Sequence, residues 1–265
     1  MGEYLGETVE SVLRNLRPGD EYFIIDGGST DNSVDIIRSY ESRITGWLSE
    51  RDKGYADALA KGFRRSTADF QCWINCGDLL LEGSLDSART LLVESGAGMI
   101  FGDDLYIDER GTIVQVSNGH VSNLADMMLY GGWTPLQDAC YWRRVLYEKV
   151  GGLDPGKKYA ADYDLFLRMS LHGECRYVPM IFSAFRRHGE QKSQSGALAY
   201  KREREACQER EVARQAKGAF HDLVKTLYYW PANRLRARLC TRKFGHAELI
   251  GQGVSGIACT PCKAA

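Results

Sequence analysis

The amino-acid sequence predicts an α/β fold, in which helices cover the faces of a parallel sheet, and three observations support this prediction. Short apolar runs typical of strands alternate with segments of helical period three times between Leu5 and Ile74. Clusters rich in glycine and aspartate follow several of these strands, as they do in sheets that bind ligands at their carboxyl edge. The composition, with 44% hydrophobic and 26% charged residues, is that of a folded globular chain.

The first half of the chain carries the alternation. Leu5, Val9, Val12 and Leu16 recur at helical spacing, and the Pro-Gly pair at 18–19 ends that helix. The following segments are predicted, in order, as a strand over 22–25, a helix over 34–40, a strand over 44–48, a helix over 55–65 and a strand over 70–74. Strands joined through helices in this way lie parallel in one sheet.

The second half of the chain follows a different rhythm. A strand over 99–101 is predicted to end at the polar residues 102–104, and segments 105–108 and 112–116 are predicted to form a hairpin. The remaining predicted elements are helices near 122–130, 143–150 and 160–171, a strand pair near 176–187, and a basic helical region over 197–244 that Pro231 interrupts.

The net charge of −1 conceals an uneven distribution. Residues 1–196 carry 21 basic and 29 acidic side chains, a balance of −8, whereas residues 197–243 carry 12 and 5, a balance of +7. We therefore divide the chain into a main domain over 1–196, a basic helical appendage over 197–244 and a flexible tail over 245–265. The overall balance argues against a nucleic-acid partner, and the acidic domain suits a cation or a polar substrate.

Two features of the sequence concern its cellular compartment. No apolar stretch approaches the roughly 18–20 residues of a membrane span, and the acidic first residues lack the apolar core of a signal peptide. We therefore expect a cytoplasmic protein. The cysteines fit a reducing compartment, since the pair Cys259 and Cys262 is assigned to a frayed terminus and four others lie in apolar segments typical of a core, namely Cys72, Cys76, Cys140 and Cys175.

Three predicted strands end in polar clusters, at residues 26–31, 75–78 and 102–104. Glycines let the backbone approach a ligand closely, while carboxylates accept hydrogen bonds from sugars and bases or bind a cation. A single Asp-Gly turn is usually structural, but three clusters at one sheet edge predict a ligand site. For Asp103 and Asp104, ligand contact and solvation of the hairpin remain equal alternatives.

Six motifs occur in order along the chain. They are IDGGSTDNS at 25–33, SERDKGYADALAKG at 49–62, WINCGD at 73–78, QDACYW at 137–142, VGGLD at 150–154 and ADYDLFLR at 161–168. With these motifs, residues 3–196 closely resemble the family-2 glycosyltransferases of the GT-A fold, inverting enzymes that use nucleotide sugars in bacterial surface-polysaccharide assembly. The resemblance implies a nucleotide-binding sheet with a mixed acceptor-side region, so that 1–196 is the catalytic domain.

The resemblance assigns donor-binding roles to residues of the first three motifs. Asp26 matches the residue that holds the nucleotide base. Asp52 and Asp57 match the segment that closes over the donor, and Lys53 lies near enough to help neutralise phosphate. Asn75 matches the start of the aspartate motif at the donor diphosphate.

The same resemblance assigns the metal ligands and the general base. Asp78 matches the carboxylate that binds Mg²⁺ or Mn²⁺ on the diphosphate, and His188 a late position that completes the metal or phosphate site, with packing as its alternative role. Asp162 matches the base that takes a proton from the acceptor hydroxyl. Its alternative role is an ordinary helix cap, and Asp164 is the rival base, which two residues later should face elsewhere.

Two departures from the family pattern qualify this assignment. Gly77 stands where a second acid is common, although one carboxylate can hold Mg²⁺ when diphosphate and water supply the other ligands. Met1 falls in the lead-in of the first helix, so that the family's first strand is missing. We therefore expect either that the true start lies upstream or that the chain is a truncated relative.

The functional prediction is transfer of a sugar from a nucleotide-sugar donor to a glycan or lipid-linked acceptor with inversion. The alternative is a catalytically impaired relative that acts as a nucleotide-binding or assembly protein. A nucleotidyltransferase is the weaker third reading, because no Gly-rich loop with a following Lys or Arg is visible. The basic region over 197–243 combines cations with aromatic residues, which suits peripheral contact with anionic lipids on the inner face of the membrane, or else a helix packed on the domain.

Overall fold

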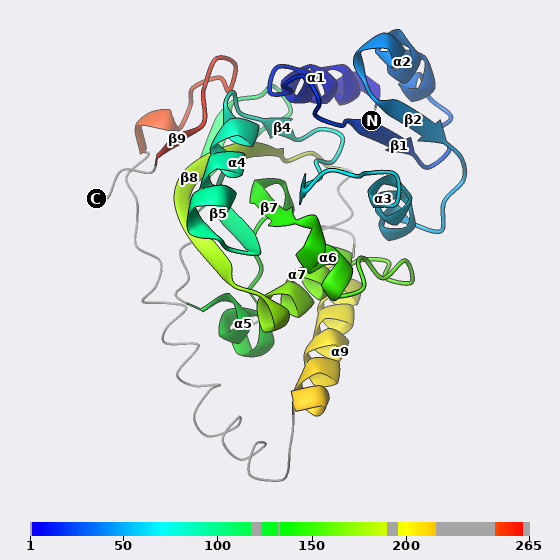
Figure 1. Ribbon diagram of the computed structural model, residues 1–265. Coiled ribbons are helices and arrows are strands. Elements are labelled where there is room, and N and C mark those ends of the chain that lie inside the picture. The colour runs from blue at the N-terminus through cyan, green and yellow to red at the C-terminus, as the bar shows by residue number, and fades with distance from the viewer. Residues whose placement is uncertain (1, 118–122, 132, 190–195, 216–246, 262–265) are drawn as a thin grey trace.

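Two sheets of unequal size form the framework of the molecule (Figure 1). The computed structural model describes residues 2–117, 123–131, 133–189, 196–215 and 247–261. Its strands are β1 (Phe23–Asp26), β2 (Gly46–Ser49), β3 (Phe70–Gln71), β4 (Leu79–Leu80), β5 (Met99–Ile107), β6 (Ile113–Val116), β7 (Cys140–Arg143), β8 (Cys175–Arg186) and β9 (Thr260–Pro261). β1 and β2 form a parallel pair, while the larger sheet has the order β3-β7-β5-β8-β4, with β6 on β5 and β9 on β8.

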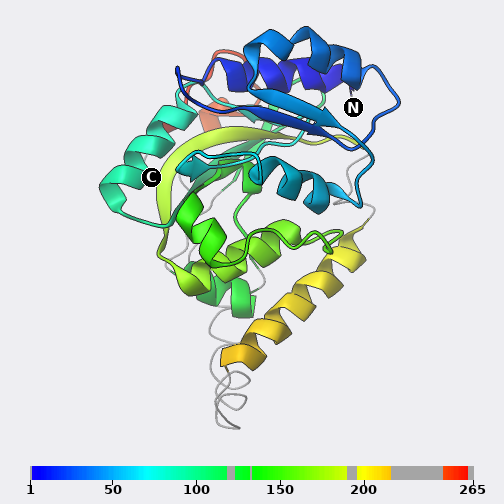
Figure 2. The ribbon, with the colours of Figure 1, turned by 45° about the vertical axis from the view of Figure 1, so that its right-hand side comes forward.

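Helices cover both sheets. They are α1 (Gly2–Leu13), α2 (Ser33–Ser39), α3 (Tyr55–Phe63), α4 (Ser84–Ser95), α5 (Leu124–Asp126), α6 (Arg144–Lys149), α7 (Ala161–His172) and α9 (Ala197–Gln215). Single helical turns occupy Glu41–Arg43, Met127–Gly131, Gln137–Ala139 and Ala247–Leu249. Figure 2 shows α1 and α2 on one side of the β1–β2 layer and α3 on the other.

The core of the large sheet is aromatic. Trp142 of β7 is fully buried, and the rings of Trp73, Phe63 and Phe166 surround it with centroid distances of 5.3, 5.6 and 6.1 Å. Such contacts join α3, the sheet and α7 into one apolar cluster. The head of α7, where Asp162 lies, is thereby fixed next to the N-terminal layer.

The predicted α/β class is confirmed, but the sheet is mixed rather than parallel. Among the described residues, only β1 with β2 and β5 with β8 pair in parallel. β3 pairs antiparallel with β7 instead of extending the β1–β2 layer. A cavity of about 260 Å³, lined by Tyr22–Ile25 on one side and by residues 70–74 on the other, separates the two layers.

Two strand predictions in the second half are wrong. β5 does not end at 102–104 but continues to Ile107, because Gly102 lets β8 approach: an added Cβ would lie 2.5 Å from the Met180 carbonyl oxygen. The segment 176–187 is one strand, β8, rather than a pair. Its register against β5 jumps from Phe101–Tyr177 to Asp103–Ile181, so that Pro179 lies in an irregular stretch and need not donate to the ladder.

Other predicted elements of the second half of the chain agree with the structure. The hairpin is confirmed as the end of β5 with β6, and the helices near 143–150 and 160–171 as α6 and α7. α4 lies in a stretch for which the sequence patterns predicted no element. Gly96 ends it in the left-handed region with φ 66°.

The C-terminal part of the described chain packs back on the domain, which corrects the expectation of a flexible tail for its residues 247–261. β9 pairs with β8, and the Cys259 N–H donates to the Glu82 carbonyl over 2.8 Å. Gln252 and Val254 make further backbone hydrogen bonds to the turn that joins β5 and β6. This segment covers a sheet edge that would otherwise expose unpaired backbone groups.

The helix at the start of the basic region also packs on the domain. α9 contacts α7 and the turn at 127–131, and buries Cys207, Glu211 and Val212. The rest of that region, 216–243, lies outside the described residues, and with it the predicted membrane contact. No helix in the described part of the chain is long and apolar enough to cross a bilayer.

Candidate active site

The carboxyl ends of β1 and β2 bring together two of the predicted donor-binding residues. Asp26 ends β1, and its Oδ2 accepts hydrogen bonds from the N–H of Gly28 (3.1 Å), the N–H of Ser29 (3.0 Å) and the Ser49 hydroxyl (2.6 Å). Burial opposes ionisation, but these donors outweigh it and hold the pKa of Asp26 below its ordinary value. The carboxylate is therefore charged and fixed at the edge of the layer.

Asp52 approaches the same turn. A Cβ on Gly27 would lie 2.3 Å from Asp52 Oδ2, so a larger residue there would displace the Asp52 carboxylate. Asp52 Oδ1 accepts a hydrogen bond from the Gly54 N–H over 2.9 Å, which fixes the loop before α3. Asp26 and Asp52 thus approach the same turn at the edge of the β1–β2 layer.

Asp57 and Lys53 are engaged at the start of α3. Asp57 Oδ2 accepts a hydrogen bond from the Lys53 backbone N–H (3.2 Å) and pairs with Lys61 Nζ (3.2 Å). Those interactions, led by the Lys53 N–H, lower the pKa of Asp57. Asp57 therefore caps its own helix, while the Lys53 side chain is exposed and available to a ligand.

The turn 75–78 is held from two directions. Thr8 of α1 accepts from the Gly77 N–H (3.0 Å) and donates to the Asp78 carbonyl (2.9 Å). Arg186, which is 2% exposed, donates from Nε to the Gly77 carbonyl (2.9 Å), and its backbone N–H donates to Asp78 Oδ1 (3.1 Å). Asn75 is exposed on the outer side of the turn.

Asp78 belongs to a group of three buried carboxyls. Asp104 of β5 and Asp138 before β7 are 0% and 1% exposed, and none of their four carboxyl oxygens has a hydrogen-bond partner in the described chain. Burial, followed by the charge of Asp138, raises the pKa of Asp78 and of Asp104 well above the ordinary value. Burial raises the pKa of Asp138 to about 6. The expectation that Asp104 solvates a hairpin is therefore wrong.

Asp103 points to the other side of β5. It is fully buried, and its Oδ2 accepts a hydrogen bond from the Tyr177 hydroxyl over 2.8 Å. Solvation of the hairpin is excluded for this residue too. Because it lies inside the sheet, its visible role is to join β5 to β8.

His188 lies beyond the end of β8, near the surface. Its ring centroid is 6.1 Å from that of Tyr4, and it lines a depression of about 320 Å³ together with Asp108, Glu109, Arg110 and Arg187. Because the lining has two acids and two arginines, a ligand in this depression would meet side chains of both charges. The predicted roles of His188, completion of the metal or phosphate site and packing, both stay predictions.

Asp162 is the second residue of α7. Burial raises the pKa of Asp162 to about 6, although hydrogen bonds from backbone N–H groups partly oppose this rise. Its Oδ1 is buried and has no hydrogen-bond partner in the described chain. The loop before it is held by Tyr55 of α3, whose hydroxyl donates to the Tyr159 carbonyl (3.0 Å) and accepts from the Ala161 N–H (2.8 Å). The donor-side motif and the head of α7 are therefore in direct contact.

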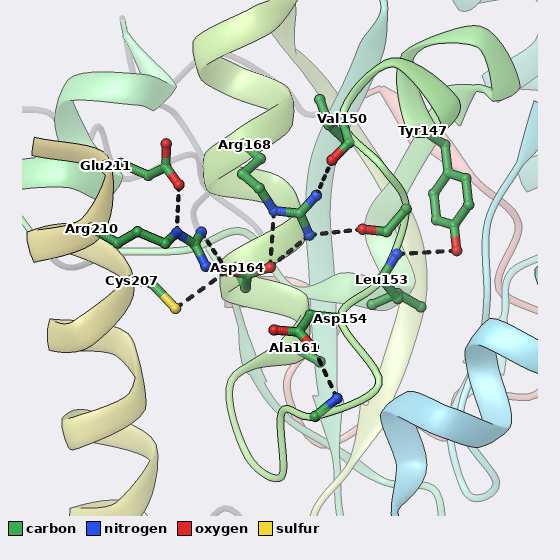
Figure 3. Close-up of polar contacts among 12 residues, drawn as sticks. Tyr147, Val150, Leu153, Asp154, Ala161, Asp164, Arg168, Cys207, Arg210 and Glu211 are labelled. Atoms are coloured by element: carbon green, nitrogen blue, oxygen red, sulfur yellow. Dashed lines mark hydrogen bonds and ion pairs between the residues drawn. The ribbon is translucent and has the colours of Figure 1, made fainter. Parts of the chain in front are cut away.

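Asp164, the rival base, lies in a different environment (Figure 3). Its Oδ2 accepts from Arg168 Nη2 and its Oδ1 from Arg210 Nη2, both over 2.6 Å, and the residue is fully buried. Burial raises its pKa, but the two guanidinium groups outweigh burial and hold the pKa below the ordinary value. An acid paired in this way has no free lone pair directed at a substrate.

Cys140 lies between Asp162 and the buried acids Asp104 and Asp138 in electrostatic terms. Burial raises the pKa of its thiol well above the ordinary value, and the charges of Asp138, Asp162 and Asp104 raise it further. The first residue of β7 therefore lies within electrostatic range of all three carboxyls. Acids far apart in the sequence converge around it.

Sequence reasoning missed several residues of this arrangement. Asp138 was overlooked although it stands in one of the six motifs, and Arg186 could have been found as the first cation of the Arg-Arg-His run at 186–188. Tyr55 also lies inside a motif. Glu203 on α9 had no signal, because its helix lies outside the resemblance.

The described residues offer few ligands for a divalent cation, and no group of three or more His, Cys, Asp or Glu side chains among them has the arrangement of a metal site. Asp78, the predicted metal ligand, is 4% exposed, and its carboxyl group already accepts hydrogen bonds from the Arg186 N–H (3.1 Å) and from Gln137 Nε2 (3.4 Å). A single carboxylate can hold Mg²⁺ only when substrate phosphates and water supply the other ligands.

Comparison with solved structures identifies the fold class as GT-A. S. aureus TarS 1–349 in complex with UDP-GlcNAc superposes with a TM-score of 0.68 and 14% identity, over 93% of this chain and 74% of that one. The mannosyltransferase PcManGT from Pyrobaculum calidifontis, in complex with GDP-Man and Mn²⁺, gives a TM-score of 0.59 and 13% identity, over 93% and 74%. The predicted GT-A fold is confirmed.

Sequence comparison then gives the family. Residues 2–140 match the family model described as glycosyl transferase family 2, and the chain belongs to that family. An uncharacterized glycosyltransferase of Nostoc sp. is 25% identical over 210 residues, which cover 74% of this chain and 64% of the relative. The match thus spans less than two thirds of that relative.

Proposed function

We propose that this chain transfers a sugar from a nucleotide-sugar donor to the hydroxyl of a glycan or lipid-linked acceptor, with inversion at the anomeric carbon. The observation that carries the proposal is the contrast between two acids on one helix. Asp162 has a buried carboxyl oxygen without a partner among the described residues and a pKa of about 6, whereas Asp164 is saturated by arginines. Only the first can accept a proton near neutral pH.

The remaining residues of the site have donor-binding roles in this proposal. Asp26 and Asp52 at the edge of the β1–β2 layer accept hydrogen bonds from the base and sugar groups of the nucleotide, and Lys53 neutralises phosphate. Mg²⁺ or Mn²⁺, held by Asp78 with the diphosphate and with His188 nearby, would stabilise the negative charge that grows on the leaving group. Asp162 takes the acceptor proton as the hydroxyl attacks in line from the opposite face.

The experiment is an Asp162→Asn substitution. The variant should bind a nucleoside diphosphate as the native chain does and lose about 10²–10⁴-fold in turnover, the usual contribution of a positioned base. UDP-GlcNAc and GDP-mannose, the donors in the two similar structures, open a panel in which released nucleoside diphosphate is measured with Mn²⁺ or Mg²⁺. Asp35→Asn on the exposed face of α2 is the matched control.

Two results would contradict the proposal. Native turnover by the Asp162→Asn variant would remove this residue from the mechanism. Binding of donors without any release of nucleoside diphosphate across the panel would favour the non-catalytic alternative, a nucleotide-binding or assembly protein. The burial of Asp78 and the missing second acid at Gly77 are the observations on which that alternative rests.

A further inference from the structure

The loop that leads into α7 takes its hydrogen bonds from two other elements. Ala160 caps the helix without a side-chain hydrogen bond of its own. The carboxylate of Glu203 on α9 instead accepts from the backbone N–H groups of Lys158 (3.2 Å), Tyr159 (2.9 Å) and Ala160 (3.0 Å). The next N–H, that of Ala161, donates to the Tyr55 hydroxyl. Four consecutive backbone donors are thus satisfied by side chains of α9 and α3.

The position of Asp162 follows from these contacts. It is the residue directly after the four clamped positions, and its own backbone enters the first turn of α7. Asp162 Oδ1 has no hydrogen-bond partner in the described chain, and the backbone N–H groups that act on the carboxylate, those of Asp162 and Tyr163, belong to the first turn of α7. The direction of the carboxylate therefore depends on how the 158–161 loop leads the backbone into α7, and Glu203 and Tyr55 hold that loop.

We propose that Glu203 of α9 is a positioning residue for the transfer reaction, which holds the 158–161 loop so that Asp162 faces the acceptor hydroxyl. The inference rests on the proposed role of Asp162. It assigns part of the active site to a helix outside the six sequence motifs. The 197–215 segment is then a component of the catalytic machinery rather than an appendage.

The charge of Glu203 suits this role. Burial opposes its ionisation, but the three N–H groups outweigh burial and hold the pKa below the ordinary value, so that the carboxylate stays charged at neutral pH. A charged acceptor forms stronger hydrogen bonds to backbone N–H groups than a neutral one does. A glutamine at 203 offers only one amide oxygen to the same three donors.

The pH dependence of kcat reports on the surroundings of Asp162. The groups that sense its charge are Tyr55 on α3, Tyr200 on α9 and Cys140 on β7, and burial is the main reason that its own pKa is raised. A loosened loop admits water to the carboxylate. Its pKa then falls toward the ordinary value, and the acid limb of the rate profile moves to lower pH.

The test compares Glu203→Gln with Glu205→Gln. Glu205 is an exposed acid on the same helix, and its carboxylate lies 3.8 Å from Lys201 Nζ. With the best donor of the panel, kcat of the Glu203→Gln variant should fall on the order of 10-fold, which is less than the roughly 10²-fold that a displaced group can cost. The variant should keep its donor KM within about twofold of the native value. Its acid limb should shift to lower pH. The 205 variant should match the native chain in all three measurements.

A second variant guards against a folding defect. Tyr55→Phe removes the other anchor of the loop and should lower kcat and shift the acid limb in the same direction. Native kcat and an unshifted acid limb in Glu203→Gln, beside an inactive Asp162→Asn, would overturn the positioning role and leave the base in place. An active Asp162→Asn would instead overturn the proposed function itself.

Discussion

At the scale of residues, α7 shows how burial and pairing separate two identical side chains. Asp162 and Asp164 lie two positions apart, and both are removed from water. Two arginines stabilise the charge of Asp164, whereas no cation of the described chain is paired with Asp162, so the pKa values of the two acids move in opposite directions. Acids whose environments separate their pKa values in this way are typical of a base beside a structural ion pair.

The pH dependence of turnover follows from the raised pKa of Asp162. A base acts only in its ionised form, so kcat should be constant above pH 7 and fall about tenfold per pH unit below the pKa of about 6. An unperturbed aspartate would keep its activity down to about pH 4. A rate profile between pH 4.5 and 8 with saturating donor measures the midpoint.

A control is required because Asp138 titrates in the same range. Asp138→Asn should retain the acid limb near pH 6 if Asp162 causes it. A limb that disappears in this variant, or a native profile that stays flat to pH 4.5, would contradict the assignment.

At the scale of elements, the long parallel pair β5–β8 carries most of the site's framework. β5 supplies Asp103 and Asp104, and β8 ends at Arg186, which fixes the Asp78 turn. Close contact between the two strands depends on Gly102, which touches the backbone and a ring of β8. A side chain at position 102 would therefore disturb the pairing of β5 with β8.

Gly102→Ala tests that dependence. The added Cβ would lie 2.5 Å from the Met180 carbonyl oxygen and 2.6 Å from the Phe182 ring, so β8 must shift. We expect a loss of about 1–3 kcal/mol in the free energy of unfolding, the usual cost of overpacking a core. Urea unfolding measures it, and Gly253→Ala, where nothing lies within 4 Å, is the control. Equal stability of the two variants would show that the strands adapt.

The same strands show what sequence patterns can and cannot predict. The alternation up to residue 65 was confirmed because each element there has its own apolar period, and Pro-Gly at 18–19, Asp26 and Gly54 mark boundaries between elements. The predicted strand ended too early because Gly102-Asp103-Asp104 has the composition of a turn. These three residues are buried inside β5, where the close approach of β8 explains the glycine. Long-range packing of this kind leaves no local signal.

The candidate site divides in the same way. Asp26 and Asp52 follow strand ends and stand in motifs, so their approach at the Gly27 turn could be anticipated, whereas a shared site with Asp162 stays a prediction. Glu203 and Arg186 form hydrogen bonds to backbone groups of segments that are distant in the sequence. Nothing in the sequence distinguishes these two residues from the other acidic and basic residues of the chain. Their roles depend on tertiary geometry, which one sequence does not encode locally.

At the scale of the whole molecule, the candidate site spans two layers. Asp26 and Asp52 belong to the β1–β2 layer, whereas Asp78 and Asp162 are attached to the large sheet, and a cavity of about 260 Å³ lies between the layers. A nucleotide held at one layer by its base and at the other by its cation-bound diphosphate would link them. Ligand binding should then stabilise the fold as a unit.

Thermal unfolding tests this linkage with UDP or GDP and Mn²⁺. At a ligand concentration of about 100 Kd, binding to the folded state adds about 2.7 kcal/mol, which raises Tm by several degrees in a domain of this size. Nucleotide with EDTA, or Mn²⁺ alone, should give little of the shift, because Asp78 provides the ion with only one protein carboxylate. Asp26→Asn should reduce the shift at fixed nucleotide concentration, while Asp35→Asn retains it. A full shift in EDTA would show that the diphosphate binds without a cation, and a full shift in Asp26→Asn would place the base elsewhere than at the end of β1.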